Sequence, residues 1–116
     1  FEGKNKMHQS GSALAYGVSE ADAFDIQMSD SHLINTPSVQ SSKIAMECQL
    51  IKTEKLVIEN HPVSSTIIFG HVIGIYIDNQ IIEDGKISIA KLKPVARLGY
   101  DEYCVIETVF SMSRNS

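Results

Sequence analysis

The sequence "STIIFGHVIGIYID", residues 65–78, decides the fold because it predicts one long β-strand, in which successive side chains point to opposite faces. Apolar residues occupy both sets of alternating positions, so both faces of the strand are largely apolar. Two apolar faces are typical of a strand at the centre of a sheet or in the wall of a barrel. We therefore predict a central strand over Thr66–Asp78 with Ile73 and Ile75 buried. Its glycines, Gly70 and Gly74, indicate bends or close backbone approach.

Two more segments have a strand pattern. One is "KIAMECQLI", residues 43–51, and the other is "EYCVIETVFSM", residues 102–112. The sequence "ENHP" at 59–62 predicts a reversal between the first of these and the central strand, which makes the pair antiparallel. Three strands with few helices predict a mostly β chain that forms an antiparallel sheet or part of a small barrel.

The remaining segments predict short elements and loops. "SEADAF", residues 19–24, predicts one short helix that begins after Ser19. The polar residues 27–42 predict a connection that runs over the surface. Asp84–Gly85 predicts a turn, and a short helical turn is expected before Pro94.

Composition limits the class of protein. The chain has 116 residues, which fits one domain, and its net charge of −4 with 10 Lys and Arg argues against a nucleic-acid partner. It has no apolar run of the roughly 20 residues that would cross a membrane. Cys48 and Cys104 leave a single disulfide open, but two reduced, half-buried thiols in a cytoplasmic protein are favoured.

The sequence has none of the motifs that carry metal or nucleophilic chemistry. His and Cys residues show no ligand spacing, no GxSxG surrounds a serine, and no glycine-rich phosphate loop is present. We therefore expect no metal ligands and no catalytic residues. Cys104 lies in a strand pattern and is expected to pack, whereas Glu47 and Glu107 are expected to be solvated on the polar sides of their strands.

His71 has two interpretations. It lies between Phe69 and Ile73 on one face of the predicted central strand. The favoured interpretation is a half-buried histidine that is hydrogen-bonded to a neighbouring strand or loop. The alternative is a side chain near the edge of a cofactor.

The run "KLKPVARLGYDEY", Lys91–Tyr103, also leaves two interpretations open. Arg97 stands between apolar residues, ahead of a glycine and two tyrosines. Either Arg97 pairs locally with Asp101 or Glu102 while Tyr103 packs under the loop, or the run presents cationic and planar groups to a flat, charged ligand. A turn at Gly99 is expected to need a backbone conformation that other residues disfavour.

Taken in order, the motifs resemble the flavin reductase-like family, whose fold is the FMN-binding split barrel. The resemblance covers about residues 7–112 and is most specific at its end. It rests on "GVSEADAF" (17–24), "AMECQLI" (45–51), "FGHVIGIYIDNQIIEDGKIS" (69–88) and "KLKPVARLGYDEYCVIETVFSM" (91–112).

This resemblance implies an antiparallel split β-barrel that is incomplete at its N-terminus, formed by 1–116 as the C-terminal portion of a flavin reductase-like domain. It implies FMN as cofactor, NADH or NADPH as electron donor, reduction of flavin as the reaction, and a homodimer. The cofactor-binding residues that it implies are Arg97, Gly99, Tyr103 and His71. Hydride transfer between stacked rings needs no acid or base from the protein.

The sequence departs from the family pattern in two places. The family's earlier strands and its phosphate-binding loop have no counterpart in the chain, so we expect tight FMN binding from a complete domain rather than from these residues alone. The glycine-aspartate-histidine sequence of one reductase subfamily is replaced by "VSS" at 63–65, and Tyr100 stands where the family has a second glycine. Two alternatives to a reductase stay open: a flavin-binding electron-transfer or sensing protein, and a truncated chain with only a structural role.

Overall fold

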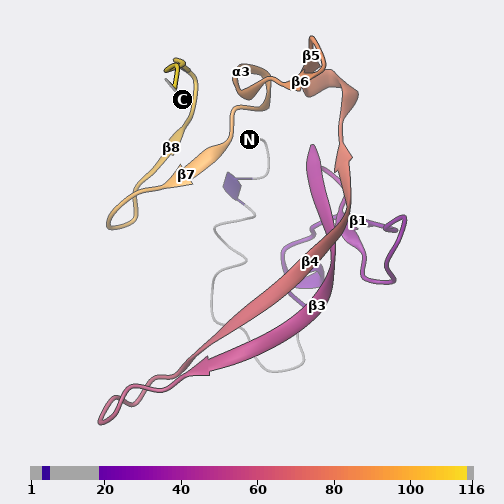
Figure 1. The fold of residues 1–116 in the computed structure, drawn as a ribbon. Helices are drawn as coiled ribbons and strands as arrows, with labels where there is room; N and C mark the ends of the chain where they lie inside the picture. The colour runs from indigo at the N-terminus through magenta and orange to yellow at the C-terminus, as the bar shows by residue number, and fades with distance from the viewer. Residues whose placement is uncertain (1–3, 6–18, 115–116) are drawn as a thin grey trace.

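The computed structural model describes residues 4–5 and 19–114. Within them, the regular structure is mostly β and consists of four antiparallel two-stranded ladders (Figure 1). The strand bounds are β1 Met28–Ser29, β2 Ser38–Val39, β3 Ile44–Leu56, β4 Ser65–Ile77, β5 Ile82–Glu83, β6 Lys86–Ile87, β7 Val95–Arg97 and β8 Tyr103–Val105. The short helices are α2 Glu20–Ala23, the 3-10 helix η1 Asn79–Ile81, and α3 Ile89–Leu92. The strands pair two by two in chain order, β1 with β2, β3 with β4, β5 with β6 and β7 with β8, and among the described residues the four ladders do not close into one barrel.

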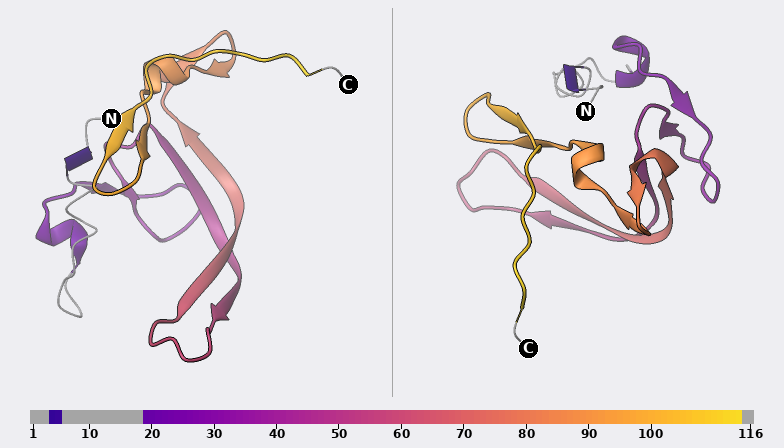
Figure 2. Two further views of the ribbon diagram at one scale, coloured as in Figure 1. Left: turned by 90° about the vertical axis from the view of Figure 1, so that its left-hand side faces the viewer. Right: turned by 90° about the horizontal axis from the view of Figure 1, so that it is seen from above.

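The longest element is the ribbon of β3 and β4, which pair antiparallel from Ile44–Ile77 to Leu56–Ser65. The reversal expected near "ENHP" lies at the tip of this hairpin, where Asn60 has a left-handed φ of 62°. Figures 1 and 2 show the ribbon twisting along its length, with its tip projecting away from the other elements. The radius of gyration of 17.6 Å exceeds the value of about 13 Å for a compact domain of about 100 residues.

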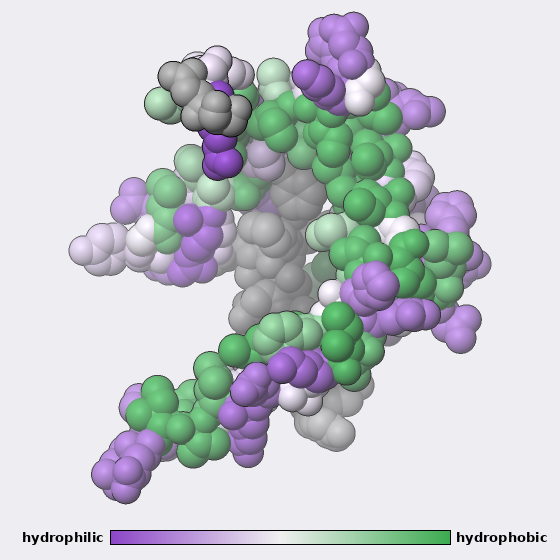
Figure 3. All heavy atoms as spheres, viewed as in Figure 1, coloured by the Kyte–Doolittle hydropathy of each residue, from purple (hydrophilic) through white to green (hydrophobic). Residues whose placement is uncertain are grey.

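The prediction that β4 is the most buried strand is wrong. Ile75 is 58% exposed and Ile73 is only partly buried, because no second layer of described residues covers the ribbon. Figure 3 shows apolar side chains along the ribbon and near its tip, open to solvent. The two apolar faces of β4 therefore belong to an uncovered ribbon.

Two register shifts also interrupt the regular alternation of side chains between the two faces of β3 and β4. Glu47 lies opposite Gly74, but the next residue of β3, Cys48, lies opposite Val72. Ile73 is therefore an extra residue on β4, and such a bulge exchanges the faces of the residues that follow. The second shift lies farther along β3, between Leu50 and Lys52.

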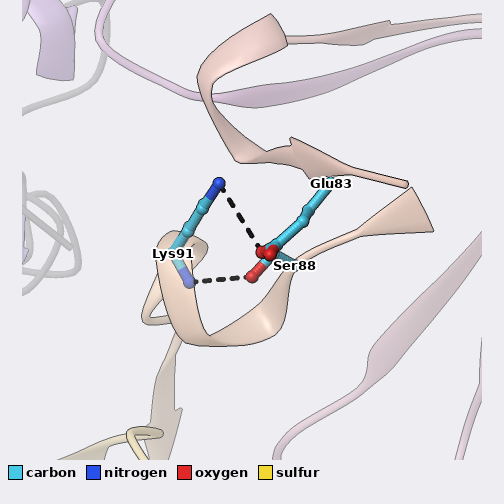
Figure 4. Close-up of polar contacts among 3 residues, drawn as sticks. All are labelled: Glu83, Ser88 and Lys91. Atoms are coloured by element: carbon cyan, nitrogen blue, oxygen red, sulfur yellow. Dashed lines mark hydrogen bonds and ion pairs between the residues drawn. The ribbon is translucent and has the colours of Figure 1, made fainter. Parts of the chain in front are cut away.

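The buried apolar centre of the described residues lies beyond the ribbon, where β4 leads through η1 toward α3. Ile81 in η1 has no exposed surface, and its carbonyl accepts a hydrogen bond from the Ser88 amide at 2.7 Å. Ser88 is also the N-cap of α3, since its hydroxyl accepts from the Lys91 amide at 3.3 Å (Figure 4). Lys93 ends α3 with a left-handed φ of 50°, directly before Pro94, which confirms the expected helical turn.

The β5–β6 hairpin lies against this centre. Asp84 and Gly85 form its turn with φ values of 51° and 75°, which confirms the expected turn and matches the mirror-image turns that suit tight hairpins. The Lys91 ammonium lies 3.5 Å from the Glu83 carboxylate and links α3 to this hairpin (Figure 4). Both side chains are about half exposed, so this ion pair orients the hairpin more than it stabilises it.

Two segments have strands whose extent differs from the expectation, residues 27–42 and the final strand. Residues 27–42 are not only a surface connection, because they contain the β1–β2 hairpin. The final strand is restricted to Tyr103–Val105 instead of running to residue 112. After the Ile106 amide bonds the Pro94 carbonyl at 2.9 Å, residues 107–114 have no strand partner in the described part of the chain. Cys48 and Cys104 are free thiols, as favoured, but they are exposed.

The fold predicts opposite responses at two isoleucines. Ile81→Ala should reduce the free energy of unfolding by about 2–5 kcal/mol, since it leaves a cavity in the buried centre. Ile75→Ala should reduce it by less than about 0.5 kcal/mol in the monomeric chain, because that side chain is mostly in solvent there. Urea denaturation followed by circular dichroism measures both values. A larger loss at Ile75 than at Ile81 would mean that another surface covers the ribbon in solution.

Candidate functional site

The β7–β8 hairpin fixes the position of Arg97. Arg97 lies opposite Tyr103 in the ladder, and its Nη1 donates to the Tyr103 hydroxyl at 2.9 Å. Its Nη2 donates to the Tyr100 carbonyl at 2.8 Å, and the guanidinium carbon lies 5.1 Å from the centre of the Tyr103 ring. Strand, loop and ring therefore hold an exposed cation in one orientation.

This geometry supports a local anchor for Arg97 but shows that the two expected partners, Asp101 and Glu102, are wrong. Arg97 is anchored by its own hairpin, but its partners are Tyr103 and the Tyr100 carbonyl. Neither Asp101 nor Glu102 forms an ion pair with it among the described residues. The anchoring uses only some of the guanidinium N–H groups, so the others can bond to water or to a ligand.

The loop between β7 and β8 presents Tyr100 to solvent. The Leu98 amide bonds the Glu102 carbonyl at 2.9 Å, and the Glu102 amide bonds the Gly99 carbonyl at 3.1 Å. Tyr100 adopts a left-handed φ of 57° at the tip and is 92% exposed. The expected backbone conformation of Gly99 is wrong: its φ is not positive, and a Cβ built on it would contact nothing within 4 Å.

His71 lies in a different part of the molecule. It is exposed on β4 opposite Gln49, so the expectation of a half-buried histidine is wrong. Figure 1 shows the β7–β8 hairpin apart from the middle of the ribbon. The structure thus brings Arg97, Gly99 and Tyr103 together and leaves His71 outside this group.

The expectation that Glu47 is solvated is wrong, and Glu47 is the site residue that sequence reasoning missed. It is only 4% exposed, and its Oε1 accepts hydrogen bonds from the amides of Leu33 at 2.7 Å and Ile34 at 3.2 Å. Gly74 makes room for this contact, because a Cβ there would lie 2.6 Å from the Leu33 Cδ1. A glycine directly across the ladder from a glutamate was the available signal, but it required the register of the two strands.

A pocket of about 310 Å³ opens beside Glu47, between the β1–β2 hairpin and the ribbon. The rings of His32 and Tyr76 are stacked there, with centroids 6.3 Å apart and planes inclined by 16°. The Ser31 hydroxyl is 2.8 Å from that of Ser38 at the same pocket. Among the described residues, its lining contains carboxylates but no Lys or Arg, which makes it a poor site for a phosphate group.

The described residues contain no group of three or more His, Cys, Asp or Glu side chains placed to hold a metal ion. Among the helices of residues 4–5 and 19–114, none is long and apolar enough to cross a membrane.

Three solved structures have a closely similar fold. Nitrilotriacetate monooxygenase component B from Bacillus cereus superposes with a TM-score of 0.83 at 24% identity, over 95% of this chain and 55% of that protein. The 2-nitrobenzoate 2-nitroreductase of Pseudomonas fluorescens gives 0.80 at 24% identity, over 98% and 55%. A Shewanella frigidimarina protein assigned as a flavin reductase with a split barrel domain gives 0.81 at 20% identity, over 98% and 56%.

Sequence comparison adds one curated relative. An uncharacterized protein of Halalkalibacterium halodurans is 26% identical over 84 residues, which are 72% of this chain and 40% of that protein. No family model matches the chain.

These similarities define the class of fold. The chain has the antiparallel architecture of flavin reductase-like split-barrel proteins, as its motifs indicated. It spans a little more than half the length of the solved structures that it matches and 40% of the curated relative.

The contacts of Glu47 predict a graded loss of stability. Glu47→Ala leaves two amide donors without an acceptor and should cost about 1–3 kcal/mol. Glu47→Gln keeps a carbonyl oxygen for both amides and should lose roughly half as much, since neutral hydrogen bonds are weaker than charge-assisted ones. Thermal unfolding of both variants, with Glu107→Ala at an exposed position as control, measures the order. Equal losses in the two Glu47 variants would contradict the proposed role of the oxygen.

Proposed function

We propose that this chain is the C-terminal portion of a flavin reductase-like domain that binds FMN and, with NADH or NADPH, reduces it. The fold supports this proposal, because the chain superposes almost completely on split-barrel proteins that include a protein assigned as a flavin reductase. The partial coverage of those proteins supports assigning the chain to one portion of such a domain.

The observation that carries the proposal is the fixed guanidinium of Arg97. Its contacts with Tyr103 and with the Tyr100 carbonyl hold the cation in place while leaving N–H groups for a ligand. The Tyr100 side chain is exposed at the tip of the loop whose carbonyl binds this cation, and its ring is available to a flat ligand. A planar ring system with a polar, electron-rich edge fits such a pair of groups.

In this proposal, each part of the hairpin has a separate task. Arg97 would face the pyrimidine edge of the flavin and stabilise negative charge there, and Tyr103 would keep the guanidinium oriented. The chemistry that bound FMN supplies is acceptance of a hydride from a nicotinamide ring. The described residues thus bind and orient, and donors for the FMN phosphate would come from outside the carboxylate-lined pocket.

The proposal includes a homodimer. Apolar side chains along β3 and β4 lie open to solvent, and a second copy of the chain is one surface that could bury them (Figure 3). An uncovered ribbon of this length favours association over an isolated monomer.

Catalysis and the role of Arg97 are tested together in the full-length protein. With added FMN, it should consume NADH or NADPH, and binding of FMN without turnover would favour an electron-transfer or sensing protein instead.

Arg97→Ala should lower the midpoint potential of bound flavin. A coupling of about 1.4 kcal/mol corresponds to about 30 mV for a two-electron couple. Arg114→Ala, which removes an equal exposed charge, is the matched control. An unchanged potential in Arg97→Ala would remove Arg97 from the site.

The 116-residue chain should bind FMN no more tightly than about millimolar, because stacking and one cation must overcome the entropy cost of association alone. Fluorescence titration measures this affinity. Saturable micromolar binding would make the β7–β8 hairpin the main anchor of the flavin.

Light scattering of the protein at micromolar concentration should give the mass of a dimer. A monomer under these conditions would contradict the proposed homodimer and leave the ribbon to be covered by a different surface.

A further inference from the structure

We propose that the pocket between the β1–β2 hairpin and the ribbon binds a small planar organic cation with N–H donors, of the amidinium or guanidinium type. Its volume of about 310 Å³ lies at the small end of the range of about 300–1,000 Å³ typical of ligand pockets. The proposal goes beyond flavin reduction, since no residue of this pocket belongs to the Arg97 hairpin.

The carboxylate of Glu47 is the group that selects a cation. Its Oε1 is occupied by the amides of Leu33 and Ile34, whereas its Oε2 accepts no hydrogen bond from the described residues. The side chain lines the pocket although it is only 4% exposed. A carboxylate has acceptor sites on both oxygens, and the described residues contain no side-chain oxygen or nitrogen that is both fully buried and unpaired, so Oε2 keeps access to the pocket and can accept from a ligand donor.

The low exposure of Glu47 strengthens the hydrogen bond that this acceptor can form with a ligand. A charge-assisted hydrogen bond formed away from bulk water is stronger than the same bond at the surface. The backbone contacts of Oε1 hold the carboxylate in place before a ligand arrives, so little side-chain entropy is lost on binding.

The aromatic pair at the pocket explains why the cation should be planar. Tyr76 and His32 present nearly parallel rings, inclined by 16°. A flat cation can lie against the face of Tyr76 and still direct its N–H groups toward an acceptor. The hydroxyls of Ser31 and Ser38, which lie 2.8 Å apart, add uncharged polar contacts at the same pocket.

The charge of the lining argues against an anionic ligand. Asp30 and Glu47 both border the pocket, and none of the described residues that line it is a Lys or Arg. A phosphate or carboxylate group would therefore meet negative charge with no cationic side chain to offset it. This disfavours the phosphate of FMN and the diphosphate of a nicotinamide nucleotide as occupants, and the pocket can be tested separately from the flavin site.

Benzamidine is a suitable probe because it is planar, cationic and carries several N–H donors. Calorimetric titration of the full-length protein should show saturable binding of benzamidine. Benzamide, its neutral counterpart, should bind at least tenfold more weakly, and benzoate should not bind. Equal affinity for benzamidine and benzoate would overturn the proposal.

Glu47→Gln is the decisive variant. Its amide oxygen can still accept from Leu33 and Ile34, while the group facing the pocket becomes an uncharged donor. We expect at least a tenfold loss of benzamidine affinity, with the Leu33 and Ile34 amides still protected from hydrogen exchange. Glu107→Gln removes the same charge at an exposed position and should bind like the native protein. Tyr76→Leu should weaken binding while leaving the carboxylate in place. Unchanged affinity in Glu47→Gln would refute the site, whether or not FMN reduction is observed.

Discussion

The contact between Glu47 and the loop after β1 joins two parts of the structure that would otherwise be independent. The β1–β2 hairpin has only two residues in each strand, too few to be stable alone. The buried carboxylate binds two amides of the connecting loop and so fixes this hairpin against the ribbon. Gly74, across the ladder, leaves the space that Leu33 occupies. One carboxylate and one missing side chain thus create the wall of the pocket.

The sequence predicted those parts of the fold that depend on local patterns. The β3–β4 hairpin, the turn at Asp84–Gly85 and the helical turn before Pro94 follow from alternation, turn chemistry and capping, each of which acts over a few residues. Burial was predicted less well, because an apolar pattern indicates which faces seek cover but not whether cover is present. Ile75 has the pattern of a core residue and is mostly exposed.

The candidate sites differ in the same way, because contacts between residues close in sequence could be predicted and long-range contacts could not. Arg97 and Tyr103 are six positions apart, and a short hairpin brings them together, so a local motif was sufficient to pair them. Glu47 and Leu33 are fourteen positions apart, and their contact depends on the register of the ribbon, on its bulge and on the path of a loop. Alternation alone placed Glu47 on the polar side of its strand. The left-handed conformation of Tyr100 was also out of reach, since a neighbouring glycine was the simpler prediction.

The unequal distribution of charge between β3 and β4 has a consequence for the handling of this protein. β3 carries Lys52, Glu54 and Lys55 near the hairpin tip, where Lys52 lies 3.7 Å from Glu54 and 4.9 Å from the centre of the Phe69 ring. β4 has no Lys, Arg, Asp or Glu along its whole length. Charged residues on an edge strand discourage unspecific β-sheet extension, and an apolar edge without them is prone to aggregation. The outer edge of β4 is therefore where amyloid-like assembly of concentrated samples would begin, and gatekeeper substitutions belong on that strand.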